Sequence, residues 1–231
     1  MKRLLTTTLI ALLLLAASNT GRAQNGGTTV QPPPRPAAQG QTIISQGRLE
    51  GSTYSNDFFG VSFTIPKDWV TQDLAAKQAI VDRGREIVHE GANEKKKAAL
   101  DAAMNRTYFL LSASKYEQNA PSPDFNALLM CVAERVPTAV IKTESDYITV
   151  AMRTLQGSSA KATVEGPVRY VQIGGAKFGL ANVRMTIGGM SAMQRYYVRL
   201  MKGHAFVFIY TYVDEQDEMI LDEFFKSVKF K

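Results

Sequence analysis

The order of apolar and polar residues divides the chain into strand and helix segments. Residues 61–65 alternate between apolar and polar side chains, which predicts a strand with one buried face. Pro66 ends this strand because proline has no N–H for a ladder hydrogen bond. Apolar residues then recur at helical spacing over residues 74–88, and a second helical segment, residues 94–104, follows a break at Gly91–Asn93.

The middle of the chain continues with two strands and one helix. Residues 108–115 and 128–136 have strand character, and the loop between them is rich in Asn, Pro and Ser. A helix is expected from about Glu144 to Leu155, because Thr143 is a good N-cap and Gly157 a good stop signal.

Three turn signals predict a meander of four antiparallel strands between Val168 and Val213. The turns are Gly174–Gly175, Gly188–Gly189 and Lys202–Gly203. Glycine tolerates the positive φ that two-residue hairpin loops require. A helix over residues 215–225, N-capped by Asp214, and a last short strand or extended tail over residues 227–230 complete the chain. Hairpin strands with helices at separate points predict an α+β fold with a central antiparallel sheet, rather than a doubly wound parallel one.

Two-residue hairpins would also fix the register of the meander and so sort its side chains onto two faces. The first face is mainly aliphatic: Ala181, Val183, Met185, Tyr196, Val198, Leu200, Val207 and Ile209. The second carries Arg169, Asn182, Arg184, Arg195, Tyr197 and Arg199 beside Phe206, Phe208, Tyr210 and Tyr212. The name Arg/Tyr face is used below for Arg169, Arg184, Arg195, Tyr197 and Arg199.

The Arg/Tyr face is the candidate binding surface. Guanidinium groups sealed from water without partners would lose several kcal/mol of hydration, so we expect this face to be partly open. Arginine suits bidentate contacts with carboxylates, which predicts an acidic or carboxylate-bearing protein partner. The alternative is that the arginines extend along the aromatic rings to the rim, or pair with acidic residues of a covering helix.

The N-terminus has the pattern of an export signal. Lys2 and Arg3 precede an apolar run over residues 4–17, which is shorter than the roughly 20 residues of a spanning helix, and small residues follow at Gly21 and Ala23. Residues 1–23 are therefore predicted to be a signal peptide, with an uncleaved anchor as the alternative. The mature protein is expected to be periplasmic or extracellular, without a transmembrane segment.

Beyond the signal, residues 24–47 are rich in Gly, Gln, Thr and Pro, and we expect a disordered tether before one domain over residues 48–231. Removal of Lys2, Arg3 and Arg22 with the signal lowers the net charge from +6 to +3. This small surplus does not indicate nucleic-acid binding. Cys131 is the only cysteine, so no intramolecular disulfide can form.

Two segments resemble PsbP-like domains, the family that includes the extrinsic photosystem II subunit PsbP and the Ran-binding Mog proteins. The first is Tyr-x-Asn-x-x-Phe-Gly-Val-Ser-Phe-x-Ile-Pro-x-x-Trp over residues 54–69. The second is Gly-His-Ala-Phe-Val-Phe-Ile-Tyr over residues 203–210, followed by an acidic helix and Ser-Val-Lys-Phe. The resemblance implies a sandwich with helices on both faces of an antiparallel sheet, usually without enzymatic activity. The longer helical block over residues 73–104 and the bacterial-type signal depart from the family.

The motif and the turns also nominate structural positions: Gly60, Pro66, Trp69, Gly174, Gly175, Gly188, Gly189 and Gly203. A catalytic constellation is not evident. His89 and His204 have no further ligands at metal-binding spacing, so we predict neither a metal nor a cofactor. Cys131 lies in an apolar strand and is expected to be a small buried residue. The alternative to a binding module is a hydrolase-like enzyme whose carboxylates, such as Asp57, Asp68 or Asp146, converge only in the folded chain.

Overall fold

The computed structural model describes residues 44–73, 81–82, 85–86, 89, 93–117, 124–156, 161–187 and 190–231. The predicted signal peptide, most of the predicted tether and Gly188–Gly189 lie outside these residues. The described part is mostly antiparallel β-sheet with three helices, which agrees with an α+β class. None of its helices is long and apolar enough to cross a membrane.

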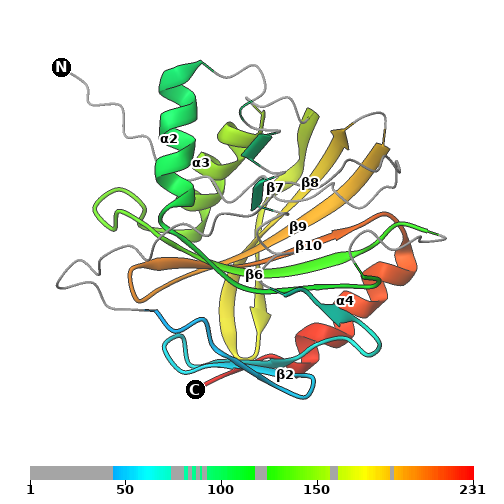
Figure 1. Ribbon diagram of the computed structural model, residues 1–231. Coiled ribbons are helices and arrows are strands. Elements are labelled where there is room, and N and C mark those ends of the chain that lie inside the picture. The colour runs from blue at the N-terminus through cyan, green and yellow to red at the C-terminus, as the bar shows by residue number, and fades with distance from the viewer. Residues whose placement is uncertain are drawn as a thin grey trace, which may run out of the picture.

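A seven-stranded antiparallel sheet forms the centre of the molecule, in the order β4-β5-β6-β10-β9-β8-β7 (Figure 1). Its strands are β4 (Val70–Thr71), β5 (Thr107–Ser114), β6 (Leu128–Arg135), β7 (Lys161–Ile173), β8 (Ala176–Ile187), β9 (Met190–Met201) and β10 (His204–Tyr212). The meander is therefore confirmed, but β7 begins earlier than Val168. A bulge between Glu165 and Arg169, where Gly166 has a φ of 76°, lets the strand continue past a Gly-Pro pair that resembles a stop signal.

The predicted register of the meander is confirmed at all three turns. The flanking pairs are Ile173 with Ala176, Ile187 with Met190, and Met201 with His204. Lys202 and Gly203 have φ values of 49° and 74°, as a two-residue hairpin loop requires. This register places Arg195 and Val198 on opposite faces of β9, because side chains alternate along a strand.

Helix α3 (Glu144–Gln156) covers the aliphatic face of the sheet. Its N-terminus is capped as predicted, since the Asp146 N–H donates to Thr143 Oγ1 over 3.1 Å and the Thr143 N–H donates to Asp146 Oδ2 over 2.9 Å. Seven of the eight residues predicted for this face are buried in the core beneath α3, and the eighth, Leu200, is partly buried and packs against it. Gly179 allows the close approach, because a Cβ there would lie 2.8 Å from the Glu144 Cβ.

Helix α2 (Glu94–Met104) begins and ends where the sequence predicts, and Figure 1 shows it beside α3. Its Ala103 is buried in the same core. Most of the helical stripe predicted over residues 74–88 lies outside the described residues, but Val81 is helical and buried.

The opposite face of the sheet is covered by α4 (Glu215–Ser227) together with a second, four-stranded sheet, at the bottom of Figure 1. This sheet has the order β1-β2-β3-β11, and its strands are β1 (Arg48–Glu50), β2 (Thr53–Asn56), β3 (Val61–Thr64) and β11 (Lys229–Phe230). The expected sandwich with helices on both faces is therefore not confirmed in that form, because a second sheet shares the covering of this face with α4. Strands β1 and β11 are three and two residues long, so they show no alternation that a sequence pattern could reveal.

The ordered domain extends further toward the N-terminus than the predicted boundary at residue 48. Ile44 is only 5% exposed and belongs to the core under the small sheet. Tyr54 Oη donates to the Gln46 carbonyl over 2.8 Å, and Asn56 Nδ2 donates to the Ser45 carbonyl over 2.8 Å. The last four residues of the predicted tether are therefore packed against the domain.

The motif residues at the start of the domain lie in turns and in the aromatic core. The Trp69 ring stacks on the Tyr210 ring with centroids 5.9 Å apart, and the Trp69 N–H donates to the Pro66 carbonyl over 3.2 Å. Gly60 has a φ of 64°, and its carbonyl accepts the Lys231 N–H over 2.8 Å. These residues join the β2–β3 hairpin to β10 and to the end of the chain.

The tip of the β7–β8 hairpin provides a matched pair of variants. Gly174 and Gly175 both have positive φ, but only at Gly174 would a Cβ clash, 2.6 Å from the Val228 carbonyl oxygen. We expect Gly175→Ala to lower the free energy of unfolding by about 1 kcal/mol through backbone strain, and Gly174→Ala to lower it by about 2 kcal/mol or more. Urea denaturation checks both values, and equal losses would contradict the contact with Val228.

Candidate functional site

The structure divides the Arg/Tyr face into an open and a covered part. Arg169 on β7 and Arg184 on β8 are exposed. Arg184 donates to the carboxylate of Glu165 over 2.7 Å, but its side chain is still 52% exposed. This end of the face, beyond α4, is exposed to solvent.

The covered part of the face lies against α4. Arg195 donates to Glu218 of α4, lies over the Tyr212 ring and is 18% exposed. Tyr197 is 5% exposed, with its ring centroid 4.3 Å from that of Phe225, and burial raises its pKa to about 12. Arg195 therefore pairs with an acidic residue of a covering helix, which was the alternative expectation for the arginines of this face.

Arg199 belongs to neither part. Its guanidinium lies 4.8 Å from the centroid of the Phe230 ring, which places it against β11 rather than α4. Below it, Phe206, Phe208 and Tyr210 are fully buried. The aromatic residues of this face thus form a closed core, and the rings are not available to a ligand.

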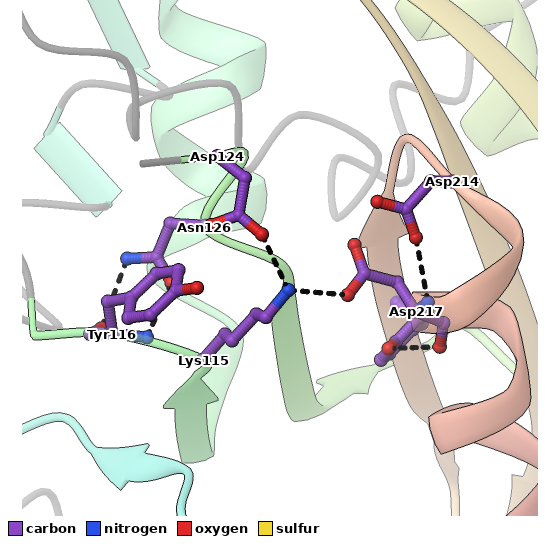
Figure 2. A network of polar contacts seen from close by, with 7 residues as sticks. Lys115, Tyr116, Asp124, Asn126, Asp214 and Asp217 are labelled. Atoms are coloured by element: carbon purple, nitrogen blue, oxygen red, sulfur yellow. Dashed lines mark hydrogen bonds and ion pairs between the residues drawn. The ribbon is translucent and has the colours of Figure 1, made fainter. Parts of the chain in front are cut away.

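A polar network at the N-terminus of α4 was missed by sequence reasoning. Figure 2 shows Lys115, at the end of β5, pointing between two carboxylates. Its Nζ lies 2.8 Å from Asp124 Oδ2 and 3.5 Å from Asp217 Oδ1. Asp217 is buried in the first turn of α4, where its N–H donates to the capping Asp214 over 2.9 Å. Lys115 and Asp217 are 102 residues apart in the chain, so no spacing rule could have joined them.

Further hydrogen bonds order the groups around this network. The Tyr116 N–H donates to Asn126 Oδ1 over 2.8 Å and Asn126 Nδ2 donates to the Tyr116 carbonyl over 3.0 Å, which ties the two ends of the connecting loop together (Figure 2). Tyr210 Oη donates to the Asp217 carbonyl over 2.6 Å. The network therefore attaches β5 and this loop to α4 and β10.

The pKa values follow from burial and from the position of the ammonium group. Burial raises the pKa of Asp217, and Lys115 only partly offsets this effect. The hydrogen bond from Lys115 lowers the pKa of Asp124, and the same bond raises the pKa of Lys115. Lys115 therefore stays protonated and Asp124 ionised at neutral pH, an arrangement suited to holding α4 in place rather than to nucleophilic or general-base chemistry.

The remaining candidates for chemistry have structural positions. Cys131 is fully buried in β6 and burial raises the pKa of its thiol, which confirms the expectation of a small buried residue. His204 lies beside the Phe58 and Phe59 rings, its Nδ1 is 2.7 Å from the Lys202 carbonyl, and burial lowers its pKa. His89 Nε2 is 3.3 Å from Asp101 Oδ1.

The three carboxylates named for a hydrolase-like site have separate local roles. Asp57 pairs with Arg48 over 3.5 Å, Asp68 occupies a turn with a φ of 64°, and Asp146 caps α3. Within the described residues, no group of three or more His, Cys, Asp or Glu side chains could hold a metal ion.

An open groove of about 1140 Å³ lies between α4 and the end of β3. Its apolar lining includes Ile65, Pro66 and Met219, and Met219 is 68% exposed. Of the acidic residues on its rim, Glu223 is paired with Lys226. The groove is thus an apolar surface beside α4, separate from the open end of the Arg/Tyr face.

No protein-family model matches the chain, and no curated protein matches it in sequence. Solved structures with a similar shape include the cyanobacterial PsbP of Synechocystis sp. PCC 6803, at 12% identity and a TM-score of 0.45, covering 82% of this chain and 99% of that chain. LpqN of Mycobacterium tuberculosis, involved in cell envelope biogenesis, has 10% identity and a TM-score of 0.40, covering 74% of this chain and 83% of that chain. PA94 of Pseudomonas aeruginosa, a protein of unknown function, has 14% identity and a TM-score of 0.36, covering 46% of this chain and 73% of that chain. At identities of 10–14%, a shared shape says nothing about activity or partner.

The network predicts opposite pH dependences for two Asp→Asn variants. The raised pKa of Asp217 contributes stability below its unfolded pKa of about 3.9, and this contribution is lost as the pH rises through its folded pKa. The Asn side chain of the Asp217→Asn variant cannot ionise. The free energy of unfolding of this variant, relative to that of the unmodified protein, should therefore increase from acidic to neutral pH. The pKa of Asp146 is lowered by hydrogen bonds from the backbone of Lys142 and Thr143, so the relative stability of Asp146→Asn should decrease over the same range.

Urea unfolding of both variants between acidic and neutral pH measures this difference. Because each variant is compared with the unmodified protein at the same pH, contributions from other carboxylates largely cancel. Parallel slopes for the two variants would show that Asp217 is not held in a desolvating site.

Proposed function

We propose that this protein is an exported, non-catalytic binding module of the PsbP-like sandwich type, which binds an acidic protein partner through the open end of the Arg/Tyr face. The signal-like N-terminus and the Pro-rich segment support export and tethering in the periplasm or outside the cell. The residue motifs over 54–69 and 203–210 support the sandwich type. The exposed guanidinium groups of the Arg/Tyr face support a role in binding.

The exposed pair Arg169 and Arg184 carries the proposal. Both lie on the same face of neighbouring strands, since Arg169 is opposite Leu180 and Arg184 follows four residues later on β8. Only one acidic side chain, Glu165, is described in contact with them. A rigid sheet that presents guanidinium groups to solvent suits bidentate binding of carboxylates. Arg195 and Tyr197 support this surface from beneath α4.

Replacement of the exposed pair tests the proposal. We expect Arg169→Gln/Arg184→Gln to reduce the recovery of an acidic partner about tenfold, because two charge-assisted contacts are lost while the core is untouched. The measurement is quantitative affinity capture from the native envelope with the mature chain as bait. Lys67→Gln/Lys142→Gln removes the same charge from exposed positions elsewhere and serves as the control. Equal recovery with both double variants would exclude the Arg/Tyr face as the binding surface.

A further inference from the structure

Strand β7 forms one edge of the seven-stranded sheet, and the sequence of its residues divides it into a protected and an unprotected half. Edge strands expose unpaired backbone groups, and proteins commonly protect them with bulges and prolines. The first half of β7 has both, a bulge after Glu165 and Pro167, which has no N–H. The second half, residues 169–173, pairs regularly with β8 on one side and has no described strand on the other.

The hairpin register shows which backbone groups of this half point outward. Ile173 and Ala176 flank a two-residue turn, so they exchange both backbone hydrogen bonds. Because hydrogen-bonded and non-hydrogen-bonded positions alternate along an antiparallel pair, the N–H groups of Tyr170 and Gln172 point away from β8. These two donors and the matching carbonyl groups can pair with a short added strand.

Basic side chains flank this edge on both faces of the sheet. Arg169 is exposed on the Arg/Tyr face. On the opposite face, Tyr170 is 45% exposed and Lys177 Nζ lies 3.8 Å from the centroid of its ring. Acidic side chains on either face of an added strand would therefore meet a cation. A second copy of β7 would instead bring Arg169 and Lys177 toward like charges.

We propose that the edge formed by residues 169–173 binds an extended acidic segment of another protein by strand addition. This inference rests on the proposed function and assigns its binding mode: backbone hydrogen bonds to β7 give affinity, and Arg169 and Lys177 select acidic side chains. The other edge strands of the two sheets, β1, β4 and β11, contain three residues or fewer and offer no comparable ladder.

Fluorescence anisotropy tests the proposal on the mature chain, with a labelled synthetic peptide in which Val-Val and Glu-Glu pairs alternate, so that Glu lies on both faces of an added strand. The same peptide with Lys in place of Glu is the charge control. Gln172→Pro removes an outward N–H without breaking the ladder to β8, and Gln172→Ala is its matched control. We expect Gln172→Pro to weaken binding of the Glu peptide about fivefold or more and Arg169→Gln to weaken it similarly, while Gln172→Ala has little effect.

Amide hydrogen exchange on the unmodified protein gives a second measurement that does not depend on a variant folding. The amides of Tyr170 and Gln172 should become protected when the Glu peptide binds. Strand addition would be overturned if binding requires Arg169 but leaves these amides unprotected and tolerates Gln172→Pro. This result would leave the proposed function intact.

Two other outcomes would also overturn the inference. Equal binding of the Glu and Lys peptides would show that the edge does not select acidic segments. The proposed function would still be tested separately, by envelope capture with the Arg169→Gln/Arg184→Gln variant. Self-association of the mature chain that Gln172→Pro abolishes, measured by sedimentation, would identify a second copy as the occupant.

Discussion

Two-residue turns between long antiparallel strands determine how the rest of this molecule is arranged. Each turn sets the register of the strands it joins, and a slip of one residue would move every side chain to the other face of the sheet. With the observed register, aliphatic side chains meet α3 and aromatic ones meet α4 and the small sheet. Both cores therefore depend on the same few turn residues, and so does the position of the Arg/Tyr face.

The meander, helices α3 and α4 and their caps could be predicted because their signals are local. Gly174–Gly175 specifies a hairpin wherever it occurs between two strands, and Asp214 and Thr143 act within one turn of their helices. The second sheet could not be predicted, because its outer strands are very short and its pairing joins distant segments: Lys229 and Phe230 of β11 lie opposite Ser62 and Val61 of β3. A sequence pattern contains no information on such pairings.

The candidate site shows the same division between local and distant information. Hairpin register placed Arg195 and Arg199 on the correct face, but it could not show that Glu218 would pair with the first and Phe230 would lie against the second. The Lys115 network was missed entirely because its members come from three separate segments. The position of α4 over the sheet therefore determines which guanidinium groups stay accessible. This position depends on tertiary contacts, which a sequence pattern does not show.

The end of the chain is built into the interior of the domain, and this has a consequence for how the protein matures. Val228 and Phe230 pack in the aromatic core, and β11 pairs with β3. In the export that we propose, the chain is threaded through a membrane from its N-terminus, so the β2–β3 hairpin emerges first and its partner β11 last, and the aromatic core stays incomplete until translocation ends. During that interval the emerging polypeptide is exposed to proteases and to aggregation, and we expect it to need chaperone protection outside the cytoplasm.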